Sequence, residues 1–163
     1  MTTPKPYEIR LASVQEAAIL SHLAFESKAY WGYSTEFMAA CQQELTLNEA
    51  YLTHNLTFVL ENEGEIIGFY ALEYISPQEV EFGYLFITPQ AIGQGYGRKL
   101  INHAKQQAYQ QGYQTMVIHS DPNAQHFYQS VGGCVVGRTP SASISGRTLP
   151  LMHLNLKNLT HST

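Results

Sequence analysis

Three glycines at alternate positions mark the part of this sequence where chemistry is most clearly indicated. They are Gly93, Gly95 and Gly97 in PQAIGQGYGRKL, residues 89–100, and a helix-like pattern follows them. Because glycine has no Cβ, a ligand can approach these backbone amides closely. The first N–H groups of a helix are unpaired, and its dipole favours an anion. The stretch predicts a site for a phosphate-bearing ligand, with a purely structural turn as the alternative.

The spacing of these glycines excludes two common phosphate-binding motifs. A P-loop requires G-x-x-x-x-G-K-[ST], whereas Arg98 and Lys99 here follow the wrong spacing and precede no hydroxyl residue. A dinucleotide-binding fold requires G-x-G-x-x-G, and the third glycine here comes one residue early. A different phosphate-binding architecture is therefore expected.

Hydrophobic periodicity and turn signals place the glycine stretch between a strand and a long helix. Strands are predicted near residues 7–11, 58–60, 66–74, 79–87, 116–119, 135 and 149–156. Helices are predicted near 14–24, near 35–45, from the glycine stretch to Gly112, and near 122–131. The predicted order is β-α-α-β-β-β-α-β-α-β-β.

Local signals support several of these boundaries. Ser13 and Glu16 have the spacing of a capping box. Residues 62–64, Asn-Glu-Gly, lie between two strand patterns and predict a β-hairpin. Asp121 and Pro122 suit the N-cap and first position of a helix.

This order predicts an α/β (α+β) fold. A hairpin run followed by a βαβ crossover gives a mixed central sheet of about seven strands, antiparallel first and parallel in the middle, flanked by about four helices. The length of 163 residues suits a single domain. We expect that domain to span residues 7–158, after a flexible N-terminus at residues 1–6.

The composition excludes some partners. A formal net charge of −4 argues against a large basic surface and hence against nucleic acid binding. The first residues do not resemble a signal peptide, and no stretch is long enough to cross a bilayer, so we expect a cytoplasmic protein without a membrane partner. Cys41 and Cys134 lie in apolar patterns and are expected to be reduced core residues.

A second motif follows the glycine stretch at a distance of one helix and one strand. The stretch DPNAQHFYQSVGG has the spacing N-x-A-x-x-F-Y-x-x-x-G, with fixed positions at Asn123, Ala124, Phe127, Tyr128 and Gly132. Together the two motifs resemble the GNAT superfamily of acetyl-CoA-dependent N-acetyltransferases, which usually has Gln or Arg where this chain has Ile92. SKAYWGYSTEFM and SISGRTLPL are similar to an uncharacterised bacterial subgroup, which extends the resemblance over nearly the whole chain.

The resemblance implies acetyl-CoA (coenzyme A) as cofactor. The implied binding residues are Leu85, Phe86, Ile87, Gly93, Gln94, Gly95, Tyr96, Gly97, Arg98, Asn123 and Phe127. The pyrophosphate is expected on the amides from Gly93 to Arg98, where Arg98 either adds charge or is a solvated helix residue. The pantetheine arm is expected to pair with residues 85–87, which requires the strands at Leu85 and Val117 to separate. Asn123 is expected to bond the same arm, with simple helix capping as the alternative.

The implied reaction is attack of a neutral amine on a thioester. Tyr128 is the predicted acid for the leaving thiolate, facing the cleft while its neighbour Phe127 packs. Glu81 lies eleven residues before Ile92, the spacing of the catalytic glutamate in several GNAT enzymes. It is the predicted base, directly or through a water. Strand alternation places residues 79, 81, 83 and 85 on one face and Tyr84 on the other. An ordinary core-edge tyrosine and a solvated glutamate are the alternatives.

The acceptor site is predicted from aromatic residues between the first two helices. Tyr30, Trp31 and Tyr33 crowd this break, and they either line a pocket or form a hydrophobic plug. Arg147 lies in a polar loop between the last strands, where it would bind an acidic group of the acceptor. Both assignments are hypotheses.

The resulting functional hypothesis is transfer of an acetyl group from acetyl-CoA to a primary amine of a small molecule by direct attack. The alternatives are a non-catalytic acyl-CoA-binding regulatory domain and a protein N-terminal or lysine acetyltransferase. No metal is expected, since no carboxylate or thiol cluster accompanies His119 or His126. The resemblance also allows a homodimer paired through the last strands.

Overall fold

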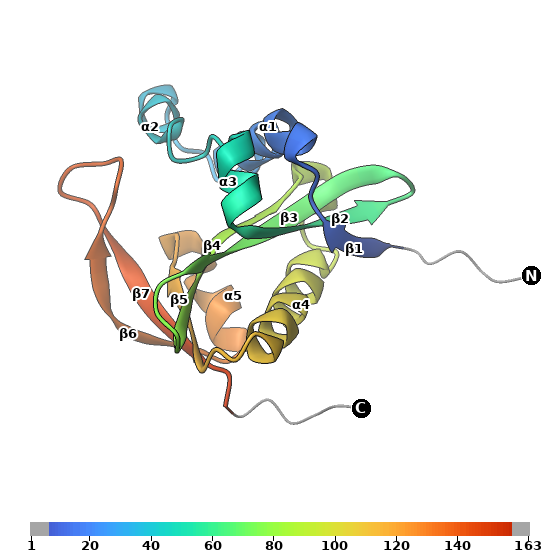
Figure 1. The fold of residues 1–163 in the computed structure, drawn as a ribbon. Coiled ribbons are helices and arrows are strands. Elements are labelled where there is room, and N and C mark those ends of the chain that lie inside the picture. The colour runs from blue at the N-terminus through green and yellow to red at the C-terminus, as the bar shows by residue number, and fades with distance from the viewer. Residues whose placement is uncertain (1–6, 158–163) are drawn as a thin grey trace, which may run out of the picture.

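A seven-stranded mixed sheet, in the order β1-β2-β3-β4-β5-β7-β6, organises the protein (Figure 1). The computed structural model describes residues 7–157, so the predicted flexible segment 1–6 and residue 158 lie outside the described residues. The strands are β1 (Glu8–Leu11), β2 (Leu56–Asn62), β3 (Glu65–Tyr74), β4 (Glu79–Ile87), β5 (Thr115–His119), β6 (Gly133–Pro140) and β7 (Thr148–Asn155). Within residues 7–157, β4 and β5 are the only strands that pair in parallel, which confirms the predicted mixed sheet.

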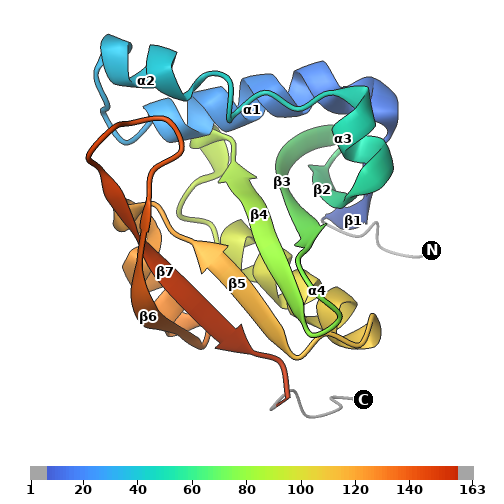
Figure 2. The same cartoon turned by 60° about the vertical axis from the view of Figure 1, so that its left-hand side comes forward.

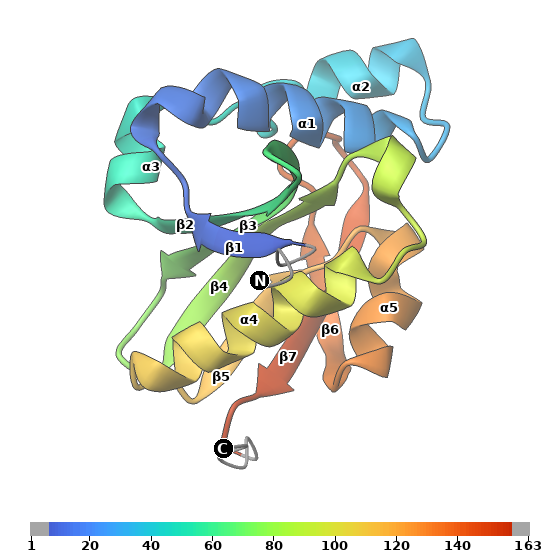
Figure 3. The same cartoon turned by 90° about the vertical axis from the view of Figure 1, so that its right-hand side faces the viewer.

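Helices cover both faces of the sheet (Figure 3). They are α1 (Ala17–Ala29), α2 (Thr35–Cys41), α3 (Glu49–His54), α4 (Tyr96–Gln110) and α5 (Gln125–Ser130). Short 3₁₀ turns precede α1, α4 and α5 at Val14–Glu16, Pro89–Ala91 and Pro122–Ala124. One apolar core lies between α4, α5 and the sheet, and a second lies between the sheet and α1, α2 and α3.

Local sequence signals explain many of these boundaries. The capping box of Ser13 and Glu16 is present and leads into α1. The hairpin between β2 and β3 turns at Glu63 and Gly64, both at positive φ, as a two-residue hairpin turn requires. Asp121 accepts a hydrogen bond from the backbone of Asn123 and caps the turn before α5. These turns were predicted from residue type alone.

Helix α3 is absent from the predicted order, so the sequence interpretation was one helix short between β1 and β2. Asn48 caps this helix by accepting from the backbone N–H of Tyr51, and Leu52 is its only buried residue. A six-residue helix with one buried position gives no hydrophobic period to detect.

Cys134 is a second correction. Cys41 is buried as predicted, whereas Cys134 is exposed. It lies on β6, which pairs only with β7 and forms the edge of the sheet. An apolar strand pattern does not reveal that the strand lies at the edge.

Candidate active site

The strands β4 and β5 separate after a short paired segment (Figure 2). They pair only where Glu79–Glu81 face Thr115–Val117, and the last residues of β5 pair with β7 alone. The β4 segment 82–87 therefore has a free edge towards β5. This is the separation predicted for the strands at Leu85 and Val117, and it leaves peptide groups that a ligand can satisfy.

A cavity of about 830 Å³ lies at this gap and reaches both faces of the sheet. On the side of α4 and α5 its lining includes Gly95, Tyr96, Gly97, Arg98, Phe127 and Tyr128. On the side of α1 its lining includes Lys28, Trp31, Glu44, Glu73, Tyr84 and Arg147. The separated strands thus open a passage through the sheet, with helix ends on one side and acidic and aromatic groups on the other.

The N-terminus of α4 forms one end of the cavity. Gly93 and Gly95 have φ values of 87° and 86°, and a Cβ on either would meet nothing within 4 Å. Gly95 is the N-cap and provides no side-chain hydrogen bond, and the first helical bond runs from Lys99 N to Gly95 O. Among the described residues, no protein group accepts from the first amides of α4. This end fits an anionic phosphate group.

The polar side chains of the glycine stretch have partners of their own. Arg98 Nη2 lies 3.2 Å from Ser130 Oγ on α5, although Arg98 also lines the cavity. Lys99 Nζ lies 5.0 Å from the ring centre of Tyr7, on the β1 side. Gln94 Nε2 donates to Gln90 O at 3.2 Å. The backbone is therefore the main group presented to a ligand.

A β-bulge at Gly83 corrects the predicted strand alternation. Tyr84 pairs with Ala71 and Phe82 with Leu72, so Gly83 is the extra residue of β4. Beyond the bulge the faces exchange: Tyr84 joins the face of Glu81, and Leu85 packs with the α4 core. The prediction that 81 and 85 share a face and that Tyr84 opposes them was wrong, because a bulge shifts the period by one residue.

The bulge creates room for a second carboxylate, which the sequence analysis missed. Glu73 lies opposite Glu81 across the β3–β4 pair and accepts a hydrogen bond from Tyr51 Oη at 2.5 Å. A Cβ added at Gly83 would collide with the Glu73 carboxylate. The available signal was cross-strand pairing, which becomes visible only when the hairpin register is known.

Glu81 occupies an environment that disfavours its charge. Its carboxylate is 3.7 Å from His119 Nε2, and its side chain is 30% exposed. Burial raises the pKa of Glu81, the charge of Glu73 raises it further, and His119 acts in the opposite direction. The net effect is a raised pKa, which suits a carboxylate that acts as a general base.

Tyr128 and Phe127 both line the cavity, from α5. Tyr128 is the more deeply buried, at 7% exposure, and its ring packs at 6.3 Å against Phe82 on β4. The Tyr128 hydroxyl has no hydrogen-bond partner among the described residues. Every fully buried side-chain polar atom in this range has a partner, so this hydroxyl is not fully buried and opens to the cavity. Burial, aided by the charge of Asp121, raises the pKa of Tyr128 and keeps it protonated.

The predicted acceptor residues separate into three environments. Trp31 lines the cavity, while Tyr30 is 56% exposed and lies outside it. Tyr33 does not line the cavity but stacks on Phe37 with ring centres 4.1 Å apart. Arg147 lines the cavity and donates to Tyr33 Oη at 3.1 Å. The aromatic stretch is therefore part pocket wall and part packing.

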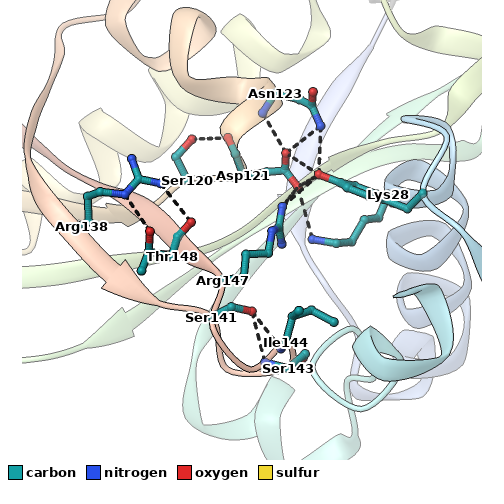
Figure 4. Close-up of polar contacts among 11 residues, drawn as sticks. Lys28, Ser120, Asp121, Asn123, Arg138, Ser141, Ser143, Ile144, Arg147 and Thr148 are labelled. Carbon is teal, nitrogen blue, oxygen red and sulfur yellow. Dashed lines mark hydrogen bonds and ion pairs between the residues drawn. The ribbon is translucent and has the colours of Figure 1, made fainter. Parts of the chain in front are cut away.

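Tyr33 and Arg147 belong to a group that we call the Asp121 cluster. Its members are Lys28, Tyr33, Asp121, Asn123 and Arg147. Figure 4 labels Lys28, Asp121, Asn123 and Arg147 of this group. Burial tends to raise the pKa of Asp121, but hydrogen bonds from Asn123 and Tyr33 and the charge of Lys28 outweigh it and lower the pKa. Burial and the neighbouring Asp121 raise the pKa of Tyr33 to about 12. Tyr33, Asn123 and Arg147 were predicted as site residues and Asp121 as a helix cap, and no sequence signal indicated that they meet.

Two negative findings apply to residues 7–157. No group of three or more His, Cys, Asp or Glu side chains is arranged to hold a metal ion. No helix in this range is both long and apolar enough to span a membrane.

Comparison with known proteins gives a family match and a set of related folds. The model of the acetyltransferase (GNAT) domain matches residues 53–132. The 5-NmdU N-acetyltransferase of Pseudomonas phage PaMx11 is 28% identical over 144 residues, which cover 88% of this chain and 95% of the phage protein.

Solved structures share the fold. A GCN5-related N-acetyltransferase from Rhodopseudomonas palustris superposes with a TM-score of 0.76 at 22% identity, over 95% of this chain and 98% of that protein. The PaiA N-acetyltransferase of Thermoplasma acidophilum, in complex with coenzyme A, gives 0.76 at 21% identity, over 91% and 98% of the two chains. Both likenesses extend over nearly the whole chain and confirm the predicted fold.

Proposed function

We propose that this chain, which belongs to the GNAT superfamily of acetyltransferases, transfers the acetyl group of acetyl-CoA to a primary amine of a small molecule by direct attack. Family membership sets the reaction class, acetyl transfer from acetyl-CoA, and leaves the acceptor open. The observation that carries the proposal is the cavity that passes between β4 and β5. An uncapped helix N-terminus lies on one side of it and a carboxylate with a raised pKa on the other.

The residues at the helix end fit the coenzyme. The open amides at the start of α4 would hold its pyrophosphate, and Gly93 and Gly95 leave space for close approach. The free edge of β4 at residues 82–87 would bond the amide groups of the pantetheine arm. Phe127, whose ring would lie 3.4 Å from a Cβ added at Gly97, would pack against the same arm. When bound, acetyl-CoA supplies the activated thioester.

The chain's own groups supply proton transfer and charge stabilisation. Glu81 accepts the proton of the incoming ammonium group, directly or through a water, so that the amine can attack. Backbone N–H groups on the free edge of β4 stabilise the negative charge that develops on the carbonyl oxygen. Tyr128, whose hydroxyl is protonated and has no hydrogen-bond partner among residues 7–157, donates a proton to the leaving sulfur. The proton that the attacking nitrogen loses as the amide forms then restores the Tyr128 hydroxyl.

The acceptor is proposed to enter from the side of α1. Glu73 and Glu81 face this part of the cavity and favour the approach of a positively charged amine. Trp31 and Arg147 supply an aromatic wall and a cation there. The phage relative is named for N-acetylation of 5-NmdU, and we carry over N-acetylation as the reaction, not its substrate.

Both sites lie within one chain, so the proposed reaction needs no second copy. The edge strand β6 is the surface on which the expected homodimer would pair. Its Val135 and Val136 are 42% and 52% exposed, and pairing of two edges would cover them.

A screen of primary amines for thiol release from acetyl-CoA tests the proposed function. Wild type should release thiol with one or more amines, and Glu81→Gln should lower kcat/KM for them by about 10²–10⁴-fold. Glu79→Gln is the matched control, because Glu79 lies on the same strand but outside the cavity lining. Equal activity of wild type and Glu81→Gln would remove Glu81 as the base. Acetyl-CoA binding with no thiol release from any amine would instead favour a regulatory domain.

A further inference from the structure

The carboxylate of Asp121 joins segments that are far apart in the chain. It accepts from Tyr33 Oη at 2.8 and 3.0 Å, and Lys28 Nζ lies 3.4 Å away. Arg147 Nη2, from the loop between β6 and β7, lies 3.8 Å from the same oxygen as Lys28. Asp121 thereby connects the end of α1, the loop after α1 and the β6–β7 loop to the start of α5.

The same carboxylate fixes the amide of Asn123. Asn123 Nδ2 donates to Asp121 Oδ1 at 3.0 Å and to Tyr33 Oη at 2.9 Å. A carboxylate only accepts hydrogen bonds, so the amide nitrogen must face it. Figure 4 shows the oxygen of this amide directed away from Asp121. Asn123 therefore offers a ligand an acceptor, and that acceptor suits an N–H group.

The charges of the cluster explain why an acid stands at this position. The side chains of Lys28 and Arg147 are only 12% and 19% exposed and lie close to the same oxygen. Without a negative charge between them, these two cations would repel each other in a poorly hydrated place. Arg147 is also stacked over Phe37, 4.8 Å from the ring centre, so it cannot move away freely.

We propose that Asp121 is a positioning residue that couples the coenzyme site to the acceptor wall. It turns the carbonyl oxygen of Asn123 towards an N–H of the pantetheine arm. Through Tyr33, Lys28 and Arg147 it also holds the end of α1 and the β6–β7 loop against the cavity. This inference rests on the proposed function, because it places the coenzyme arm beside Asn123.

Calorimetric titration of coenzyme A tests the coupling. Tyr33→Phe is the most informative variant, since Tyr33 does not line the cavity and loses only the hydroxyl that orients Asn123. We expect Tyr33→Phe and Asp121→Asn each to weaken binding by about 5–30-fold, with partial recovery in Asp121→Glu. The affinity of the double variant for coenzyme A should lie within about twofold of the affinity of the weaker single variant. Both changes release the same side-chain amide, that of Asn123.

Glu16→Gln is the matched control for lost stability. Glu16 is also a carboxylate paired with an arginine and with a capping N–H, but it lies outside the cavity lining. It should lower Tm and leave coenzyme affinity unchanged. If folded Tyr33→Phe and Asp121→Asn bind coenzyme A as tightly as wild type, the coupling is overturned and the proposed function stands. If folded wild type does not bind coenzyme A, both are overturned together.

Discussion

Glu81 is held in a place that resists its ionisation. Burial and the facing carboxylate of Glu73 both disfavour its charge, and His119 compensates only in part. Such a residue is a stronger base than an exposed glutamate, which is useful for taking a proton from an ammonium group. The same environment should reduce the stability of the fold.

Glu81→Gln is therefore expected to raise Tm at pH 7 while it lowers activity. The pKa of Glu81 is higher in the folded state than in the unfolded state, so the folded state binds a proton on Glu81 more tightly. An ionised Glu81 therefore destabilises the fold. Gln is neutral at every pH. The rise in Tm should therefore shrink as the pH is lowered towards about 4, where Glu81 becomes protonated in both the folded and the unfolded wild type. Thermal unfolding at several pH values measures this. A lower Tm at pH 7 would contradict it.

Tyr128→Phe should separate catalysis from structure. The hydroxyl of Tyr128 has no protein partner among the described residues, so its removal should leave Tm and coenzyme affinity nearly unchanged. Loss of the proton donor should lower kcat by about 10²-fold. Steady-state kinetics beside a coenzyme titration provides both readouts. An unchanged kcat would assign Tyr128 to packing only.

At the scale of elements, strong periodicity made some parts of the site predictable. The bounds of β4 and the buried face of α4 follow from the sequence, because Leu100, Ile101, Ala104 and Ala108 recur at helical spacing. The bulge at Gly83 could not be predicted, since a bulge depends on the register with β3. The Asp121 cluster could not be predicted either, because the contacts of Tyr33 within it join residues 88 to 114 positions apart.

A partly buried histidine on α4 should make the stability of the fold depend on pH. His103 Nδ1 lies 2.7 Å from Tyr70 Oη in the core, and burial lowers the pKa of His103. Below about pH 6.5, His103 is protonated in the unfolded chain but stays neutral in the folded chain. The free energy of unfolding therefore falls as the pH falls. The lowered pKa values of Glu16 and Asp121 act at more acidic pH.

The variant His103→Gln keeps a polar partner for Tyr70 and removes the titrating group. Between pH 8 and 5.5 its free energy of unfolding should therefore fall less than that of wild type. Urea denaturation at intermediate pH values provides the comparison. A constant difference between the two proteins across this range would show that His103 does not cause the dependence.

At the scale of the whole molecule, the sheet separates the two groups of cavity residues to which the proposed mechanism assigns coenzyme and acceptor. The glycine end of α4 and the residues of α5 lie on one face, and the acidic and aromatic residues lie on the other. The gap between β4 and β5 connects them. In the proposed mechanism, the two substrates enter from opposite faces and meet beside Glu81.

The most direct test of this account is a calorimetric titration of acetyl-CoA into wild type, Gly95→Glu and Gly112→Glu. Both glycines have positive φ, 86° and 93°, and open space around a Cβ, so the two variants carry equal charge and similar strain. Gly95 begins α4 at the cavity, whereas Gly112 follows its far end. We predict that wild type and Gly112→Glu bind while Gly95→Glu does not. Equal binding by both folded variants, or none by wild type, would contradict the account.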